Sequence, residues 1–398
     1  MYDVIIVGAG ASGCFLALTL KYKNPNLKVL LLEKNDKLGK KILITGNGRC
    51  NIGNTNIKID DYSSNSSLDR FKTLIENRSS NYIELLKEFG VLITNEEDRL
   101  YPYSNQALTV CKSFERALLN YDVEVMYNYD VKKVKKENNV FIINNDLKSK
   151  NVVIATGGKT YPKTGSTGMG YELLKSFGHN ITNLYPSLTS LKTNLKYIKD
   201  LAGVRVNSKL SLYCDNNLIN EEQGQLQFTK DSLSGICIFN LSRYACKLMN
   251  DKKRLCIKVD YAPDKEVNEL SDYIKSFSNY IIEDALSCIL NNKLARVIAK
   301  TLKLEGNKVI NLTDRDLSSV VDMIKGMNFI ITETGDFDTS QVTSGGASLD
   351  EFTDNLESKK VDGLYAIGEV LDVDGKCGGY NLSWAFTSAL IVSNDITI

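Results

Sequence analysis

The residues best suited to chemistry begin with a short glycine-rich stretch near the N-terminus. Its GxGxxG spacing is formed by Gly8, Gly10, Ala11, Ser12 and Gly13. In a strand–turn–helix unit, the first glycine permits a tight turn, the second lets the backbone approach a pyrophosphate, and the third lets the helix pack closely. Glu33 ends the next apolar segment, where a carboxylate accepts hydrogen bonds from ribose hydroxyls. The pattern predicts a dinucleotide site and leaves FAD and NAD as alternatives.

Two later segments favour FAD. The apolar segment 151–156 ends in a turn of small residues formed by Ala155, Thr156 and Gly157. A second apolar segment, 361–368, ends in Gly368 and is followed by Glu369, Asp372, Gly378, Gly379, Tyr380 and Asn381. A carboxylate there suits the ribityl polyol, and the N-terminus of the following helix suits the pyrimidine carbonyl of a flavin. Alone, the Gly368-Glu369 pair is equally consistent with an ordinary loop, so the prediction of FAD rests on all three segments together.

These residues need a parallel sheet to bring them together. Residues 3–8 and 28–33 form apolar strand patterns around a helical pattern at 12–23, and strands buried on both faces are typical of parallel sheets. Further strands are predicted at 123–126, 151–156 and 361–368, with a hairpin at 129–143 that turns at Asn138-Asn139. Helices are predicted at 68–89, 106–119 and 380–394. The predicted fold class is α/β, with a Rossmann-like, three-layer FAD-binding domain.

The character of the sequence changes between residues 188 and 335. Residues 188–262 are rich in strand patterns, at 203–229 and 254–260, with a hairpin signal at Asp215-Asn216-Asn217. Residues 263–335 are expected to be helical, at 266–277, 280–290, 293–303 and 314–325. We therefore predict one FAD-binding domain built from residues 1–187 and 336–398, with 188–335 as an inserted domain.

Composition restricts the classes of function. The 398-residue chain has 49 basic and 48 acidic residues, and no apolar run approaches the ~20 residues of a membrane helix. We expect a cytoplasmic protein without a nucleic-acid or membrane partner, because phosphate binding needs clustered basic residues. The nine cysteines form no CxxC pair, and the single histidine, His179, is expected at a helix C-terminus, where its cationic form suits the helix dipole. No metal site is predicted, and the chemistry is assigned to a cofactor.

The sequence resembles the BaiN/YhiN-like family of FAD-dependent oxidoreductases, also labelled aminoacetone-oxidase-like. The matching blocks lie at 39–51, 155–170, 228–235, 343–346 and 368–382, so the resemblance covers essentially the whole chain. It implies a Rossmann-like FAD domain interrupted by a β-barrel and helices. It also implies further cofactor contacts from Lys34, Lys41, Gly46, Arg49, Cys50, Asn51 and Val131.

Two of these implied contacts have a specific form, and one loop has a suggested role. Arg49 would reach phosphate or flavin oxygens, although a solvated basic loop is the alternative for residues 39–51. The backbone of Val131 would meet the adenine. The loop at 165–170 would cover the flavin or the substrate.

Three functions remain open. The first is reduction of a small organic substrate, such as a conjugated double bond, with electrons from NADH or NADPH passing through the flavin N5. The second is oxidation of an amine or alcohol with release of hydrogen peroxide. The third is a flavin-bound scaffold or RNA-associated protein with vestigial redox activity, and the balanced charge argues against its RNA form. No side chain is predicted to be catalytic. The substrate is expected to enter a cleft between the inserted domain and the carboxyl edge of the sheet. We expect direct hydride transfer without a disulfide relay through Cys50 and Cys377, since no CxxC pair is present.

Overall fold

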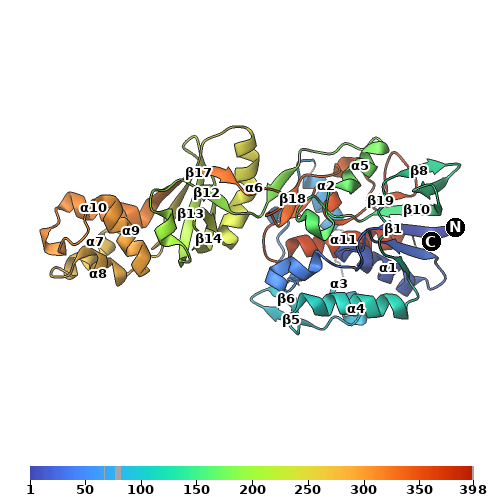
Figure 1. The fold of residues 1–398 in the computed structure, drawn as a ribbon, viewed down its shortest axis with the longest axis horizontal. Helices are drawn as coiled ribbons and strands as arrows, with labels where there is room; N and C mark the ends of the chain where they lie inside the picture. The colour runs from blue at the N-terminus through green and yellow to red at the C-terminus, as the bar shows by residue number, and fades with distance from the viewer. Residues whose placement is uncertain (67, 77–81, 397–398) are drawn as a thin grey trace. The chain divides into compact units, whose positions relative to one another are not determined.

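The computed structural model describes residues 1–66, 68–76 and 82–396. The chain forms two compact units, each of which is described by itself (Figure 1). The first unit consists of Met1–Tyr185 and Phe337–Ile398, and the second of Pro186–Asp336. One unit is therefore assembled from both ends of the chain, and the other is formed by the segment between them.

The first unit is built around a sheet with the strand order β7-β2-β1-β10-β9-β8, in which β19 also pairs with β10. Its parallel strands are β1 (Tyr2–Val7), β2 (Val29–Leu32), β7 (Glu124–Met126), β10 (Leu147–Ile154) and β19 (Leu364–Ala366). An antiparallel hairpin, β8 (Val134–Glu137) and β9 (Val140–Ile143), extends it, and Asn138 and Asn139 at its turn have φ of 49° and 61°. The predicted parallel sheet and this hairpin turn are confirmed. The central strands are buried apolar runs because both faces of the sheet are covered.

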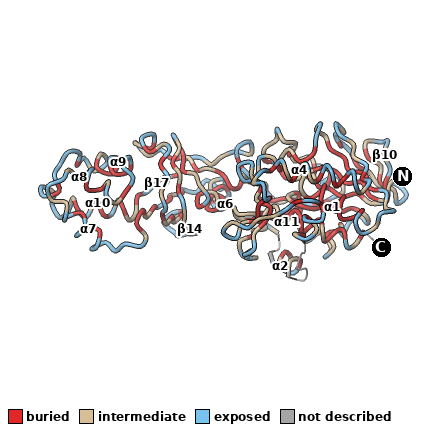
Figure 2. Tube along the Cα trace, turned by 90° about the horizontal axis from the view of Figure 1, so that it is seen from below, coloured by how far each residue is buried: buried red, intermediate tan, exposed pale blue. Residues whose placement is uncertain are grey.

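Two helices from opposite ends of the chain pack against each other, α1 (Ala11–Lys23) and α11 (Tyr380–Asp395). Figure 2 shows buried residues along both of them, in agreement with their largely apolar sequences. Phe15 of α1 meets Phe386 of α11 with ring centroids 5.2 Å apart. The glycine motif near the N-terminus leads into α1, and the Gly378-Gly379 motif leads into α11, so the packing of these helices links the two motifs.

Smaller elements complete the first unit. Its other helices are α2 (Leu68–Glu76), α3 (Tyr82–Glu88), α4 (Ala107–Asn120) and α5 (Met169–Ser176). Its other strands are β3 (Gly53–Asn54), β4 (Tyr62–Ser63), β5 (Ile93–Glu96), β6 (Arg99–Pro102), β18 (Val342–Ser344) and β20 (Asp374–Gly375). The helix predicted at 68–89 corresponds to α2 and α3, and its residues 77–81 lie outside the described residues.

The second unit combines a closed antiparallel barrel with a group of helices. The barrel order is β12-β15-β14-β13-β16-β17, and closure leaves no free sheet edge. Its strands are β12 (Leu191–Thr193), β13 (Arg205–Cys214), β14 (Asn217–Phe228), β15 (Ser232–Ser234), β16 (Leu255–Asp260) and β17 (Met327–Thr334). The helices are α6 (Ile236–Asn250), α7 (Val267–Ser276), α8 (Ile282–Ser287), α9 (Asn292–Leu302) and α10 (Asp314–Gly326), and β11 (Tyr185–Ser187) leads into the unit. The barrel implied by the resemblance is confirmed, whereas α6 and β17 were not predicted.

The described residues contain no helix that is long and apolar enough to cross a bilayer.

Candidate functional site

The glycine motif forms the turn between β1 and α1, and its three glycines have different surroundings. Gly8 has a φ of 109°, and a Cβ on it would lie 2.6 Å from the Ala155 carbonyl oxygen. A Cβ on Gly13 would lie 1.9 Å from the carbonyl oxygen of Gly8, so both positions are needed for close packing. A Cβ on Gly10 would meet nothing within 4 Å. The turn is therefore packed on the protein side and open at Gly10, as the approach of a pyrophosphate requires.

Helix α1 begins in a way that suits an anion. Its N-cap is Gly10, which has no side chain to accept a hydrogen bond from the first amides of the helix. The first amides of a helix have no intrahelical partner and carry a partial positive charge. Ala11, Ser12 and Gly13 lie in this first turn, at the point where a phosphate group fits.

Glu33 lies against the same turn. Its side chain is buried, and its Oε2 accepts a hydrogen bond of 2.9 Å from the amide of Ala9. Its Oε1 accepts from the amide and the side-chain Nδ2 of Asn35, at 2.9 and 2.6 Å. The next residue, Lys34, points to Thr167 with an Nζ–Oγ1 distance of 3.2 Å. The structure thus brings Glu33 to the glycine motif, as a ribose-binding carboxylate requires. The sequence analysis did not identify Asn35 as a partner of Glu33.

The small-residue turn after β10 lies beside the glycine motif. The amide of Ala155 donates to the Val7 carbonyl at 2.9 Å, which continues the pairing of β10 with β1. A Cβ on Gly157 would lie 3.2 Å from Ser166 Oγ, and a Cβ on Gly170 would lie 2.0 Å from Thr156 Oγ1. The 165–170 loop therefore packs across the end of β10. Its suggested role as a cover for flavin or substrate stays a prediction.

Glu369 joins three separate segments at the carboxyl end of the sheet. Its Oε2 lies 2.7 Å from Lys41 Nζ and 3.3 Å from the amide of Gly158, and its Oε1 accepts from the Thr343 amide at 2.8 Å. Lys41 also donates to Thr160 Oγ1 at 2.9 Å. The predicted residues Lys41 and Glu369 form a partly buried ion pair, with side-chain exposures of 23% and 18%. Thr160 and Thr343 were missed, although both lie in blocks, 155–170 and 343–346, that carry the family resemblance.

The segment from Gly46 to Asn51 folds on itself, and Arg49 contacts the β5–β6 hairpin and the residues that follow it. Gly46 and Cys50 have φ of 55° and 59°. The guanidinium of Arg49 pairs with Glu96 and donates to Asn105. It also lies over the ring of Tyr101, 4.1 Å from the centroid. Its predicted contact with phosphate or flavin oxygens stays a prediction.

Cys50 is a buried thiol. Burial raises the pKa of Cys50 to about 12. A thiol in this state is not a nucleophile near neutral pH, because the thiolate is the reactive form. The structure thus gives no support to Cys50 as a redox relay.

Asparagine side chains fix the loop that precedes α11. With its amide oriented to satisfy all its polar neighbours, Asn51 accepts from the Gly379 amide at 3.1 Å and donates to the carbonyls of Gly53 and Leu100. Asn381 accepts from the Gly375 amide at 2.8 Å and donates to the Gly375 carbonyl at 2.9 Å. These side chains hold the loop, so a cofactor contact from this region would use backbone groups.

Tyr380 and Gly378 are tied to neighbouring segments in the same way. The hydroxyl of Tyr380 donates to Asp61 Oδ2 at 2.9 Å, and Asn54 Nδ2 donates to the Gly378 carbonyl at 3.1 Å. A Cβ on Gly379 would lie 2.3 Å from the Gly53 carbonyl oxygen, so the chains touch at this point.

Two further predicted residues have polar groups that a ligand could use. Val131 is buried, and its backbone makes no hydrogen bond to another described residue. Asp372 is fully buried, and its Oδ2 has no hydrogen-bond partner within the described parts of the chain. Burial raises the pKa of Asp372. Gly368, on the same segment, donates its amide to Ser388 Oγ at 2.9 Å.

His179 differs from the prediction. It follows the end of α5, as predicted, but it is buried, and burial lowers the pKa of its imidazole, which disfavours the expected cationic form. Its Nδ1 lies 3.0 Å from Glu351 Oε2 and its Nε2 lies 2.8 Å from Ser358 Oγ. This resembles a Ser–His–acid arrangement. Ser358 is only 3% exposed, and its Oγ also accepts from two backbone amides, so it is a structural hydroxyl.

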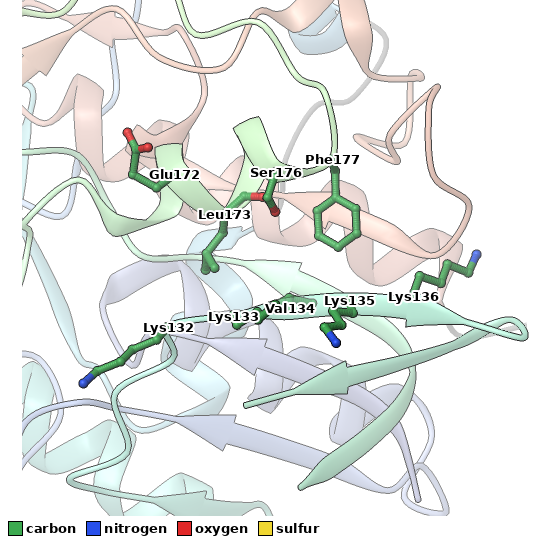
Figure 3. A pocket seen from close by; sticks show the side chains of 9 residues that line it. All are labelled: Lys132, Lys133, Val134, Lys135, Lys136, Glu172, Leu173, Ser176 and Phe177. Atoms are coloured by element: carbon green, nitrogen blue, oxygen red, sulfur yellow. The ribbon is translucent and has the colours of Figure 1, made fainter. Parts of the chain in front are cut away.

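A pocket of about 370 Å³ lies between β8 and α5 (Figure 3). It is lined by Lys132, Lys133, Val134, Lys135, Lys136, Glu172, Leu173, Ser176 and Phe177. β8 is the last strand of the sheet, and lysines on an edge strand disfavour pairing with another chain. The lysines therefore have a sufficient structural explanation. Within the described residues, no group of three His, Cys, Asp or Glu side chains could hold a metal ion.

Comparison with known proteins identifies relatives along the whole chain. The model of the HI0933-like protein Rossmann domain matches residues 2–395. A protein of Clostridium scindens named 3-dehydro-bile acid delta(4,6)-reductase is 30% identical, over 98% of each chain. Proteins named ribosomal RNA dihydrouridine synthase are 27% identical: that of Haemophilus influenzae over 97% of this chain and 96% of its own, and that of Escherichia coli over 99% and 98%.

Solved structures share the fold at low identity. An open flavocytochrome c3 fumarate reductase matches with a TM-score of 0.50 and 16% identity, over 100% of this chain and 78% of its own. The 3-ketosteroid delta1-dehydrogenase of Sterolibacterium denitrificans matches with a TM-score of 0.51 and 12% identity, over 100% and 99%. These matches concern the fold, and the predicted fold class is confirmed. The chain belongs to the HI0933-like family of FAD-binding Rossmann proteins, the BaiN/YhiN-like flavoproteins, and is an FAD-dependent oxidoreductase.

Proposed function

We propose that this protein is a reductase that uses NADH or NADPH to add hydrogen across a carbon–carbon double bond conjugated with a carbonyl group. The observation that carries the proposal is the 30% identity over nearly the full length to a protein named as a bile acid delta(4,6)-reductase. Dihydrouridine likewise differs from uridine by a saturated carbon–carbon bond next to a carbonyl. The names of both groups of relatives thus describe one type of reduction on different substrates.

The ADP half of FAD would be held by the β1–α1 turn. The α1 amides and the open face of Gly10 would receive the pyrophosphate, and Glu33 would accept from the ribose hydroxyls. The unpaired backbone of Val131 would meet the adenine. The first amides of α1 and the backbone of Val131 are free to bind in this way, whereas Glu33 also accepts hydrogen bonds from Ala9 and Asn35.

The flavin half would lie toward α11 and Glu369. The Lys41–Glu369 pair would face the ribityl chain, and the backbone at Gly379 would face the pyrimidine ring. FAD, when bound, supplies the hydride chemistry, whereas the protein binds, orients and excludes water. No side chain of this chain is required as a nucleophile.

A small-molecule substrate is favoured over RNA. With 49 basic and 48 acidic residues, the chain has a formal net charge of only +1, which gives little general attraction for a polyanion. Reduction of an RNA base is the second candidate function, and the two relatives named as ribosomal RNA dihydrouridine synthases favour it. Oxidation of an amine or alcohol with release of hydrogen peroxide is the remaining alternative.

The donor is tested by mixing the purified holoprotein with NADH or NADPH without oxygen and following the flavin absorbance. Rapid bleaching by one of them is expected, and bleaching by neither would contradict the proposed donor. The reduced protein is then given a steroid 3-oxo-4,6-diene or purified ribosomal RNA, and mass spectrometry measures the gain of two hydrogens. Gain on the steroid supports the proposal, gain on uridine only supports the RNA candidate, and fast peroxide formation with neither supports an oxidase.

The ribose assignment has its own test. Glu33→Ala should weaken FAD binding by roughly tenfold to a hundredfold, about 1.5–3 kcal/mol for hydrogen bonds to a charged group. Glu305→Ala changes an exposed carboxylate of the second unit and serves as the control. Equal FAD dissociation constants for Glu33→Ala and the wild type would remove Glu33 from the ribose.

A further inference from the structure

Asn35 makes an unusual number of contacts for a residue outside any nucleotide motif. Its amide and its Nδ2 both donate to Glu33 Oε1, at 2.9 and 2.6 Å. The same Nδ2 donates to the carbonyl of Thr164 at 3.1 Å. One side chain thus connects the carboxylate at the end of β2 with a loop almost 130 residues further along the chain.

These contacts orient the Glu33 carboxylate. The Ala9 amide fixes Oε2 at 2.9 Å, and Asn35 fixes Oε1. Hydrogen bonds from donors to a carboxylate stabilise its charged form and hold it in one rotamer. A carboxylate has about four lone-pair sites, and three donors of the protein occupy sites on Glu33, so acceptor capacity remains for a ribose hydroxyl. A carboxylate held in place by its own protein binds a ligand without first losing side-chain freedom.

The loop side of the contact is equally close. Thr164 ends a short 3₁₀ turn, Pro162–Thr164, and Gly165 follows with a φ of 111°. A Cβ on Gly165 would lie 2.7 Å from Asn35 Nδ2, so the loop backbone touches this amide. Lys34 adds a second link to the loop through Thr167. The 162–167 loop is therefore held next to Glu33, at the proposed ribose end of the nucleotide site.

We propose that Asn35 is a positioning residue for cofactor recognition: it presents Glu33 to the adenosine ribose and pins the 162–167 loop beside it. The proposal rests on the ribose assignment of Glu33 made above. It adds a determinant of FAD affinity that the GxGxxG motif does not contain. It also means that a movement of the Thr164 backbone would shift the side-chain amide of Asn35, and with it the Glu33 carboxylate.

The test compares FAD dissociation constants of the apoprotein, measured by fluorescence titration, for the wild type, Asn35→Ala, Asn35→Asp and Asn35→Ser. Asn35→Ala keeps the backbone donor and should weaken FAD binding by about tenfold. Asn35→Asp has nearly the same shape but replaces the donor with a carboxylate that faces Glu33 and the Thr164 carbonyl. It should weaken binding further, by roughly a hundredfold near neutral pH. Asn35→Ser retains a short donor and should bind FAD more tightly than Asn35→Ala.

A pH series separates positioning from packing. Two adjacent carboxylates share a proton as the pH falls, so the defect of Asn35→Asp relative to the wild type should shrink toward about pH 5. The defect of Asn35→Ala should stay nearly constant. Asn26→Ala, at an exposed asparagine beyond α1, is the matched control and should bind FAD as the wild type does.

Two results would overturn the proposal. Wild-type affinity in Asn35→Ala would show that the side chain does not assist the ribose site. Wild-type affinity in Asn35→Asp would show that only its shape matters. If Glu33→Ala also binds FAD normally, the fault lies in the ribose assignment. If Glu33→Ala is impaired and the Asn35 variants are not, the role of Asn35 alone is refuted.

Discussion

Replacement of Gly10 with alanine should separate cofactor binding from folding. Gly10 has a φ of −83°, which alanine adopts without strain, and a Cβ there would meet nothing within 4 Å. The free energy of unfolding of the apoprotein should therefore stay within about 1 kcal/mol of the wild-type value, or rise slightly, because alanine restricts the unfolded chain. The new methyl group would occupy the space through which a pyrophosphate reaches the α1 amides. Loss of one hydrogen bond to a charged phosphate corresponds to roughly a tenfold to hundredfold weaker FAD affinity.

The matched variant is Gly13→Ala, three residues further along. Its Cβ would lie 1.9 Å from the Gly8 carbonyl oxygen, so α1 must move away from the turn. Overpacking of this kind costs about 1–3 kcal/mol or more, and FAD binding should fall together with stability. Urea unfolding of the apoproteins and FAD fluorescence titration measure both quantities. Unchanged FAD affinity in a stable Gly10→Ala protein would refute the assignment of the turn to the pyrophosphate.

Three further predictions concern other parts of the first unit. Glu369→Gln should lower the free energy of unfolding by about 1–3 kcal/mol in urea, because it breaks the Lys41 pair and leaves one of two backbone amides, Gly158 or Thr343, without its acceptor; an unchanged midpoint would contradict this role. A Cys50→Ser/Cys377→Ser double variant should keep FAD and most of its turnover with NAD(P)H, and a variant that accepts electrons but cannot pass them on would restore the relay. Burial lowers the pKa of His179, so its contribution to stability is complete above about pH 6.5 and is lost as the pH falls below that value. His179→Gln should lack this part of the pH dependence in urea unfolding between about pH 7.5 and 5.5, and identical slopes would refute it.

The nucleotide fold could be predicted because its signals are local. Glycine spacing, an apolar strand on each side and an acid at Glu33 all lie within one βαβ unit. The parallel strands were visible because burial on both faces leaves continuous apolar runs. The turn at Asn138-Asn139 was visible because asparagine readily adopts positive φ.

The elements that were missed depend on tertiary packing. α6 has Gly235 as its N-cap, makes no side-chain cap, and contains isoleucine, phenylalanine and tyrosine, so its local helix signal is weak. Its packing on β14 stabilises the helix where local sequence preference does not. β17 follows directly on α10, without a turn signal between them.

The side-chain partners were beyond local reasoning for the same reason. The spacing of Glu369, Lys41 and Thr343 along the chain says nothing about their contact, which the sheet topology creates. The resemblance implied a contact from Arg49 to phosphate or flavin oxygens, and it gave no sign that Glu96 on a hairpin is also its partner. Residue type identifies a candidate, and topology decides its neighbours.

The central claim, that this chain binds FAD through an ADP-recognising turn, is tested most directly by the identity of the cofactor. The purified protein is denatured, and the released flavin is analysed by chromatography and mass spectrometry. FAD in near-equimolar amount is predicted, since the β1–α1 turn and Glu33 recognise an ADP half that FMN lacks. Release of FMN, or a colourless protein that FAD does not reconstitute, would contradict the account.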